Sequence, residues 1–568
     1  MLTRAMASAF LLITAACATA PSTREPAAPA GASAPSEPGR TLVAAVRVEP
    51  LTLAERSLRE QGVAVYLSSR MFNADLAILD DTGTPRPYLV EAFPQLNTDS
   101  WQVFPDGRMQ TSYHLKPNLT WHDGEPLTAD DWVFSWRVYS TPELGAIGRP
   151  MSVIDEVSAP DARTIMITWR QPYPDAESFT TRDAYFPALP RHILESTYAD
   201  GQWDAFVNHP FWTTEYIGLG PFRLDRWEPG AFYEAVPFAG HVNGPPKIQR
   251  IKVLFISNSN TALANMLSGV VQLSADTSIR TAEVSILRRE WGPDGGTVIL
   301  HPNQWRAAFF QFRPDVLTQP ALMDLRVRKA LAMTVNKDPI NEAVYEGNSL
   351  ISNTMIPPLT ETGKAIDRAI TKHTYDPRAA EQLLEDAGFR RGADGIYTSP
   401  SFGRFHSELA TNAATDNEAE LAILDHTWTQ FGLEMQQNVV GGGLERDNQL
   451  RATFPGIWVN NTSVGEPALL NHMTVRIPKA ENRWQGGNRG GWSNPDFDRL
   501  ADAYATTLDR AERLQQLVDM AKLQADQLPA ISLFFVTQPW AFVSGLTGPK
   551  LVAGESNMSW NIETWEFR

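Results

Sequence analysis

The chain of 568 residues is too long for one compact core, so we expect two or three domains. Hydrophobic residues account for 43% and charged residues for 20%, a composition typical of globular proteins. The formal net charge of −16 argues against nucleic acid as a partner, because neutralising phosphates requires a basic patch. The same charge says little about a small ligand, since the local field of a cleft can have the opposite sign.

Residues 1–17 are predicted to be an export signal. Arg4 precedes a short apolar run that ends at Cys17, the only cysteine of the chain. The run is about ten residues long, whereas a membrane span needs about 20. Cleavage before Cys17 would expose it for lipidation, as in a bacterial lipoprotein signal, with Thr14 standing where leucine is usual. A plain secretory signal cleaved nearby is the alternative.

Residues 18–40 are rich in proline, alanine, serine and glycine, and they are predicted to be a disordered tether. Such a composition cannot bury enough apolar surface to fold. A lipid on Cys17 would keep the tether at a membrane, while the tether holds the folded part away from it. With a single cysteine no disulfide framework exists, so stability must come from well-packed cores.

From Thr41 onward, predicted strands and helices alternate, which indicates an α/β, or mixed α and β, class. Period-two apolar patterns predict strands at residues 41–48, 109–115, 163–169, 251–255 and 531–536. Capping residues and helical spacing predict helices at residues 261–268, after Asp376-Pro377, after Asn494-Pro495 and at residues 510–527. None of these start and stop signals indicates what the protein binds.

The segment from Trp101 to Trp136 contains the densest series of such signals. Residues 105–107, Pro-Asp-Gly, indicate a tight turn, and Asp123-Gly124 indicates a second one. Thr128 and Asp131 form a T-x-x-D helix start, in which a side-chain oxygen can accept a hydrogen bond from an unpaired backbone N–H. In the order and identity of its residues, the segment resembles the signature block of the extracellular solute-binding proteins of peptide- and nickel-type ABC importers, family 5.

Several further blocks resemble the same family in the same order along the chain. They lie at residues 218–230, 246–276, 324–331, 375–389 and 492–500. Together with the first block, the resemblance covers residues 41 to about 548. A match of this extent is far more specific than any single short motif.

The resemblance implies a two-lobed, periplasmic-binding-protein-like fold of type II, cluster C, with an extra subdomain inserted in the first lobe. Mapped onto this chain, lobe I comprises residues 41–75, 210–300 and 530–568, the inserted subdomain residues 76–209, and lobe II residues 301–529. The chain is expected to cross between the lobes near residues 297–312 and 528–536.

The resemblance also implies that a ligand lies between the lobes and that hinge closure buries it. We therefore expect a substrate-binding protein that delivers a peptide or another small polar solute to the permease and ATPase subunits of an ABC importer. A sensory or chaperone-like solute-binding lipoprotein without transport is the alternative, and a secreted hydrolase is a third hypothesis. We expect an exported monomer at the periplasm or cell surface, anchored to the membrane by its lipid.

The segment that begins at Trp458 matches a motif that supplies an aspartate for the ligand ammonium in peptide-binding relatives. Asn460 or Asn461 stands where that aspartate is expected. An amide lacks the charge that makes such hydrogen bonds about twice as strong, which argues against an ordinary peptide N terminus. Trp458 is expected either to stack on a ligand or to be a core tryptophan.

Arg313 stands where the family commonly has asparagine, and Arg306 lies nearby in the sequence. If both face the cleft, their guanidinium groups suit a carboxylate or a phosphate. A surface or interlobe salt bridge is the alternative for each. Together with the missing aspartate, these departures favour an anionic or a neutral polar solute.

Four further residues are candidates for ligand contact. Asn488 and Trp492 belong to a glycine-rich stretch that borders the cleft in relatives, and a plain surface loop is the alternative. Phe72 and Asn73 stand where the family often has an aromatic-acidic pair.

The sequence contains none of the H-E-x-x-H, G-x-S-x-G or Walker-type motifs, so we expect no enzyme. The ten histidines are scattered without the spacing of metal ligands, so we expect no cofactor and no metal held by side chains alone. Capture of a metal chelate remains compatible with the sequence.

Overall fold

The computed structural model describes residues 41–58, 66–145, 149–180, 185–554 and 556–568. The predicted export signal, Cys17 and the predicted tether at residues 18–40 lie outside the described residues. The described ranges all belong to one compact unit, Arg40–Arg568.

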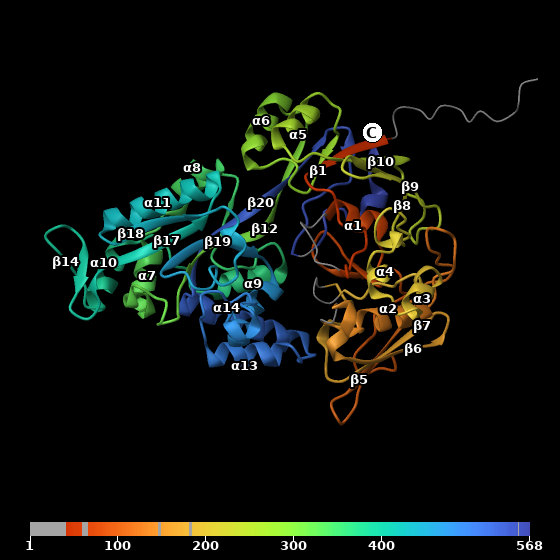
Figure 1. The fold of residues 1–568 in the computed structure, drawn as a ribbon, viewed down its shortest axis with the longest axis horizontal. Coiled ribbons are helices and arrows are strands. Elements are labelled where there is room, and N and C mark those ends of the chain that lie inside the picture. Colours follow the sequence, from red (N-terminus) through yellow and green to blue (C-terminus); the bar gives the residue numbers. More distant parts are fainter. Residues whose placement is uncertain (1–40, 59–65, 146–148, 181–184, 555) are drawn as a thin grey trace, which may run out of the picture. The chain divides into compact units, whose positions relative to one another are not determined.

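In the described residues, the largest sheet has 11 strands, and two long strands at its centre are paired along almost their whole length. Figure 1 shows these two strands, β12 in green and β20 in blue, running side by side. The order of the sheet is β18 (Glu434–Val440), β17 (His406–Asn412), β19 (Ile457–Ser463), β12 (Gly296–Phe310), β20 (Ala530–Val543), β11 (Leu273–Ser274), β1 (Thr41–Val46), β10 (Arg250–Phe255), β9 (Phe232–Pro237) and β8 (Phe222–Glu228), and β13 (Leu350–Ile351) also pairs with β20.

The remaining strands form small sheets. One has four strands in the order β4 (Trp101–Val103), β5 (Met109–His114), β7 (Thr164–Trp169) and β6 (Ile154–Asp161). The others are β2 (Ala77–Leu79) with β3 (Pro85–Pro87), β14 (Arg390–Arg391) with β15 (Tyr397–Ser399) and β16 (Gly403–Arg404), and β21 (Leu546–Thr547) with β22 (Glu566–Phe567).

The helices fall between these strands, as an alternating α/β pattern predicts. They are α1 (Tyr66–Phe72), α2 (Asp130–Tyr139), α3 (Arg191–Ala199), α4 (Trp203–Val207), α5 (Ser259–Leu267), α6 (Thr281–Trp291), α7 (Leu325–Met333), α8 (Lys337–Tyr345), α9 (Glu361–Ala369), α10 (Pro377–Asp386), α11 (Thr415–Phe431), α12 (Glu466–Leu470), α13 (Pro495–Tyr504) and α14 (Arg510–Gln527).

The predicted capping signals work largely as expected. The Asp376 side chain accepts a hydrogen bond from the backbone N–H of Ala379 at the start of α10, and the Asn494 side chain caps α13. The T-x-x-D start of α2 works in the reverse direction. The Asp131 carboxylate accepts from the backbone N–H of Thr128 at 2.9 Å, and the Thr128 side chain caps no helical N–H.

One predicted strand is longer than its apolar pattern indicated. The pattern ends at residue 536, whereas β20 continues to Val543. Pro539 lies within this extension, opposite Leu300 of β12. Proline normally argues against a strand interior, and here the pairing with β12 overrides that local signal.

The buried side chains separate into groups that follow the chain. One cluster combines residues 42–275 with residues 540–565. Two other clusters draw on residues 305–535 only. β20 contributes Phe534 to the second group of clusters and Trp540 to the first, so its two ends belong to different cores.

Candidate functional site

Parallel strands approach the middle of the β12–β20 ribbon from one side. β11 is antiparallel to β20, with Ser274 opposite Ala541, and Ala541 in turn faces Val298 near the start of β12. β1 is parallel to both β11 and β10. The carboxyl ends of β1, β10 and β11 therefore point along β12 toward its middle.

A second set of parallel strands approaches from the other side. β19 is antiparallel to the last part of β12, with its carboxyl-terminal Ser463 opposite Gln304. β17 is parallel to β19 and to β18. The two sets of carboxyl ends thus face each other across the middle of the ribbon. In open α/β sheets, ligands bind outside the carboxyl ends of the strands, so this region is the candidate site.

Carboxamide side chains gather at this position. Asn461 Nδ2 donates to Gln304 Oε1 at 3.1 Å, and Asn412 Nδ2 donates to Asn460 Oδ1 at 3.3 Å. We define the carboxamide group as the following residues of β12, β17, β19 and β20: Asn303, Gln304, Asn412, Asn460, Asn461 and Gln538. These side chains are neutral, and each can donate and accept hydrogen bonds, so they suit uncharged polar groups.

Arg306 lies under this group and is occupied by a partner within the chain. Its Nε donates to Glu420 Oε2 at 2.6 Å, and Arg306 is 1% exposed. Its other nitrogens donate to Thr411 Oγ1 at 3.2 Å and to Asn461 Oδ1 at 3.4 Å. Burial raises the pKa of Glu420, and the Arg306 charge opposes that rise. In this conformation Arg306 orients Asn461, and its charge is neutralised by Glu420.

Trp458 is buried on the face of β19 that also carries Asn460, two residues along the strand, whereas Asn461 lies on the other face. Trp458 packs with Ala410, Val440 and Phe454 in a small cluster, and its ring meets that of Phe454 edge-on. Among the described residues, neither Trp458 Nε1 nor the buried Asn412 Oδ1 has a hydrogen-bond partner. Buried polar atoms are rarely left unpaired, so this face offers one donor and one acceptor that a ligand or water could satisfy. Whether Trp458 stacks on a ligand stays a prediction.

Arg313 donates mainly to the protein backbone, with one further hydrogen bond from Nη1 to Gln311 Oε1 at 3.1 Å. Its Nη1 donates to the carbonyl oxygens of Ala452 and Arg489 at 2.7 and 2.6 Å, and its Nη2 donates to that of Pro478 at 2.9 Å. Burial lowers the pKa of Arg313. In this structure Arg313 holds two loops together, and direct ligand contact by it stays a prediction.

Asn488 and Trp492 also act within the loop that contains them. Asn488 Nδ2 donates to the carbonyl oxygens of His472 at 2.9 Å and Trp492 at 2.6 Å. Asn488 Oδ1 accepts from the Trp492 backbone N–H at 3.1 Å, and the Trp492 ring packs on Phe497. Both residues are buried, so they fix the loop conformation in this structure.

Phe72 and Asn73 lie at the end of α1. Phe72 is fully buried against the rings of Tyr216 and Tyr233. Asn73 Nδ2 donates to the carbonyl oxygen of Leu53 at 2.8 Å, and Tyr216 donates to Asn73 Oδ1. These contacts join α1 to β9 and to neighbouring loops of the same core.

Nothing in the sequence patterns indicated a buried acid at the opposite carboxyl edge. Asp276 follows β11, and its Oδ2 accepts from the backbone N–H of Leu67 at 3.0 Å, which caps α1. Asp276 Oδ1 is buried, and no partner for it exists in the described part of the chain. Burial raises the pKa of Asp276 to about 7. Only the folded chain brings residues 67 and 276 together.

A polar chain of four side chains also escaped the sequence patterns. Arg513 of α14 pairs with Asp175 at 3.0 Å and lies over the Tyr504 ring at 4.2 Å. Tyr504 in turn donates to Glu466 Oε2 at 2.5 Å. Glu466 begins α12, just after β19. Residues on this path join α14 and the end of β19 to the segment that contains Asp175.

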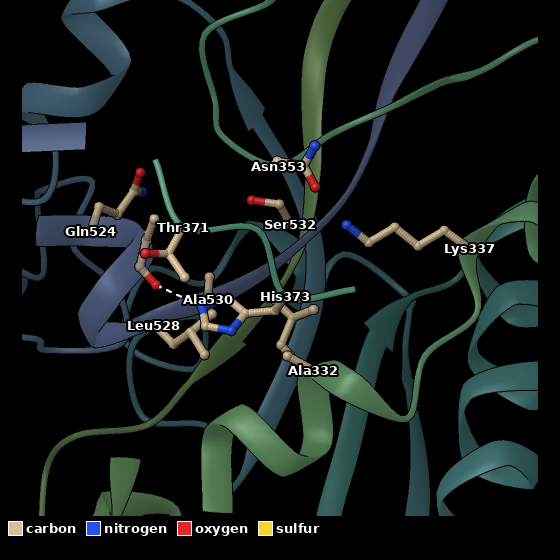
Figure 2. Close-up of a pocket in the computed structure, with 11 residues that line it drawn as sticks. Ala332, Lys337, Asn353, Thr371, His373, Gln524, Leu528, Ala530 and Ser532 are labelled. Atoms are coloured by element: carbon tan, nitrogen blue, oxygen red, sulfur yellow. Dashed lines mark hydrogen bonds between the residues drawn. The ribbon is translucent and has the colours of Figure 1, made fainter. Parts of the chain in front are cut away.

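A small polar cavity lies next to β20, close to the carboxyl end of α14 (Figure 2). Its volume is about 20 Å³, enough for roughly one water molecule. Figure 2 shows Lys337 extending toward Ser532 and Asn353, while His373 Nε2 lies 3.0 Å from the Ala525 carbonyl oxygen. Burial lowers the pKa of Lys337 to about 8. This cavity is too small to hold a peptide or a similar solute.

Within the described ranges, no three His, Cys, Asp or Glu side chains come together in an arrangement suited to a metal ion. No described helix combines the length and the apolar character needed to cross a bilayer.

The sequence matches one family model over residues 91–469, described as the bacterial extracellular solute-binding proteins, family 5, middle region. It is similar to the dipeptide-binding protein of Escherichia coli K12, with 25% identity over 465 residues that cover 78% of this chain and 80% of that protein.

The fold is similar to that of solved structures in the same group. NikA from Brucella suis in complex with Fe(III)-EDTA gives a TM-score of 0.73 at 17% identity, covering 93% of this chain and 100% of that one. The oligopeptide-binding protein from Thermus thermophilus with a pentapeptide gives 0.68 at 21% identity, covering 93% and 96%. The predicted α/β, two-lobed fold is confirmed.

The pKa of Asp276 generates a pH-dependent prediction. Because its pKa is raised from about 3.9 in an unfolded chain to about 7, the folded state binds its proton more tightly. Its ionisation therefore lowers stability as pH rises between those values. Asp276→Asn should therefore be more stable than the unmodified protein. This difference in the free energy of unfolding should grow from about pH 4 and level off near pH 8 at up to about 4 kcal/mol.

Urea unfolding at a series of pH values measures this difference. Asp99→Asn is the matched control for the substitution itself, because Asp99 is exposed. A stability difference for Asp276→Asn that does not change with pH would show that Asp276 keeps an ordinary pKa in the folded protein.

Proposed function

This chain belongs to the bacterial extracellular solute-binding proteins of family 5, and we propose that it captures a peptide or another small polar solute for an ABC importer. The observation that supports this most directly is the pair of carboxyl edges that face each other across one ribbon, β12–β20. Carboxamide side chains line one edge and the middle of that ribbon. Binding of this kind requires no covalent chemistry.

The ribbon provides a mechanism for closure around the solute. Its pairing shifts register between Pro302 and Gln304 and again between Arg306 and Ala307. Such irregularities concentrate bending and twisting at one position of a strand pair. A solute that touches both edges stabilises the closed state more than the open one, and only this differential affinity can shift the population toward closure.

The domain boundaries are part of the proposal. Lobe I comprises residues 41–75, 210–300 and 530–568, the inserted subdomain residues 76–209, and lobe II residues 301–529. The hydrophobic clusters support the division between lobe II and the rest, because one draws on residues 42–275 and 540–565 and two draw on residues 305–535. The long strands β12 and β20 then form the two crossings.

The carboxamide group favours neutral polar parts of a solute. Arg306 is neutralised by Glu420, and Arg313 is occupied by backbone carbonyl oxygens. Asp416 lies in the first turn of α11 and is exposed. Partial desolvation raises the pKa of its carboxyl group, and the charge of Arg280 opposes that rise. An isolated charge on the solute would lose its hydration at the carboxamide group without gaining a free counter-charge there. Hydroxyl, amide and backbone groups would instead pair with the six carboxamides.

Export and anchoring complete the proposal. We assign residues 1–17 as the signal, Cys17 as the lipidation site and residues 18–40 as the tether. The anchored protein would diffuse along the membrane as a monomer and present its closed form to the permease.

The capture of a solute can be tested on the protein as purified. Native mass spectrometry after gentle purification should detect a bound small molecule, because a closed cleft releases its solute slowly. A strain that lacks the protein should also lose uptake of that molecule. Protein that is always empty, together with unchanged uptake of every peptide tested, would contradict the proposed role.

Asn460→Asp tests whether the carboxamide group contacts the solute. The aspartate can still accept the hydrogen bonds from the backbone N–H of Asn461 and from Asn412, and it adds a negative charge. We expect the affinity ratio of triglycine to N-acetyltriglycine to rise by about tenfold, because a charge-assisted bond to the ammonium replaces a neutral one. Isothermal titration measures both affinities.

Asn438→Asp serves as the control, because Asn438 is exposed on β18 and the substitution adds the same charge. It should leave the ratio unchanged. If Asn460→Asp leaves the ratio unchanged too, Asn460 lies outside the solute site.

The lipid anchor has its own test. Cys17→Ser should abolish incorporation of labelled fatty acid and release the protein from the membrane fraction, because the acyl chains supply the membrane affinity. Ser22→Ala, in the proposed tether, should leave both properties intact. A protein that remains membrane-bound without Cys17 would show that its anchor lies elsewhere.

A further inference from the structure

Arg451 and Arg489 are two half-buried arginines. In the described residues, neither guanidinium forms an ion pair or a side-chain hydrogen bond, and Arg451 Nε is buried without a partner. By contrast, the half-buried Arg513 pairs with Asp175, and the fully buried Arg306 pairs with Glu420. The guanidinium groups of Arg451 and Arg489 thus leave two sets of donors unused in the described residues.

The two residues are brought together by a fixed set of hydrogen bonds. Arg313 Nη1 donates both to the Ala452 carbonyl oxygen at 2.7 Å and to the Arg489 carbonyl oxygen at 2.6 Å. Gln311 Nε2 adds a bond to the same Ala452 oxygen at 3.0 Å. One side-chain nitrogen therefore holds the backbone next to Arg451 beside the backbone of Arg489. The backbone segments that carry the two arginines are therefore held side by side without a ligand.

The loop that contains Arg489 packs tightly against Arg313. A Cβ added at Gly491 would lie 3.1 Å from Arg313 Cγ, and one added at Gly490 would lie 2.3 Å from the Phe310 carbonyl oxygen. Position 490 therefore requires glycine for the close approach, and position 491 favours glycine because its φ is +77°. This constraint keeps Arg489 at a constant distance from the segment of Arg451.

Burial and mutual repulsion disfavour the charged forms of Arg451 and Arg489 when no anion lies between them. Burial lowers the pKa of Arg451, and burial together with the Arg451 charge lowers the pKa of Arg489 to about 10. Both groups still carry a positive charge at neutral pH. Two like charges that are partly removed from water repel each other, and an anion between them would relieve that repulsion.

We propose that Arg451 and Arg489 form a binding site for a carboxylate or phosphate group. Their guanidinium groups present planar pairs of N–H donors, which match the oxygens of either anion. The segment that begins at Arg451 continues to Phe454, whose ring packs on Trp458 of β19. The anion would be either a free inorganic ion or an acidic group of a longer molecule. The proposal does not depend on coupling to transport.

Isothermal titration with inorganic phosphate, at constant ionic strength, tests the site in the full-length protein. Arg451→Gln and Arg489→Gln should each weaken phosphate binding by about tenfold or more, because each removes charge-assisted hydrogen bonds. Arg446→Gln is the matched control: Arg446 is exposed on the same segment, and its loss should change the affinity little. Arg451→Lys keeps the charge without the planar donors and should give an intermediate loss.

A matched pair of peptides separates the two sources of the anion. Triglycine and triglycine amide differ only in the terminal carboxylate. If an acidic group of a bound chain occupies the site, triglycine should bind about tenfold more tightly than its amide, and Arg451→Gln should remove that preference. If the site takes only free anions, phosphate binding should depend on both arginines while the two peptides bind alike.

Two results would overturn the proposal. Phosphate affinity that is undetectable, or equal in the unmodified protein and both glutamine variants, combined with no carboxylate preference, would show that water alone solvates the pair. Circular dichroism of each variant guards against loss of folding. If Arg451→Gln fails to fold, Arg451→Lys takes its place. The apolar stem of lysine is longer than that of glutamine and preserves more of the local contacts.

Discussion

The antiparallel register of β12 with β20 is the constraint on which the rest of the structure depends. Because the two strands pair from Gly296 opposite Val543 to Phe309 opposite Ala530, each has one end in either group of hydrophobic clusters. The remaining strands add to the two ends with opposite directions. That single geometric fact makes two carboxyl edges face each other, and with them the ends of the strands that carry the carboxamide group and Asp276.

The arginine charges at two places close to β19 differ in whether an acid of the protein pairs with them. At the carboxamide group, the chain neutralises its own arginine, since Glu420 lies 2.6 Å from Arg306, and what remains are neutral donors and acceptors. At Arg451 and Arg489, no acid in the described part of the chain pairs with either guanidinium, and Arg313 uses its hydrogen bonds to hold the two loops together. Neutral hydrogen-bonding groups and anions would therefore be recognised by different surfaces, which allows a solute with both to bind in one orientation.

Local features of the fold were open to sequence reasoning because their causes lie within a few residues. The helix Arg510–Gln527 was predicted with both ends correct, since Asp509 caps it and Pro529 follows its end. The Asn494-Pro495 and Asp376-Pro377 starts were correct for the same reason. Where a longer-range contact decided the outcome, prediction failed: β20 runs past Pro539 because β12 pairs with it along its length.

The sequence by itself determined the α/β class, through its alternating strand and helix patterns, and it determined the family and the two-lobed fold through the resemblance of its ordered blocks to family 5. Only the tertiary structure decided what each candidate residue does. Arg306 and Glu420 are 114 positions apart, and Arg313 and Arg489 are 176 positions apart, so no local pattern could reveal that one arginine is neutralised and another holds loops together. The unpaired state of Arg451 and Arg489 likewise depends on which side chains the fold brings near, and burial then sets the energetic weight of every charge.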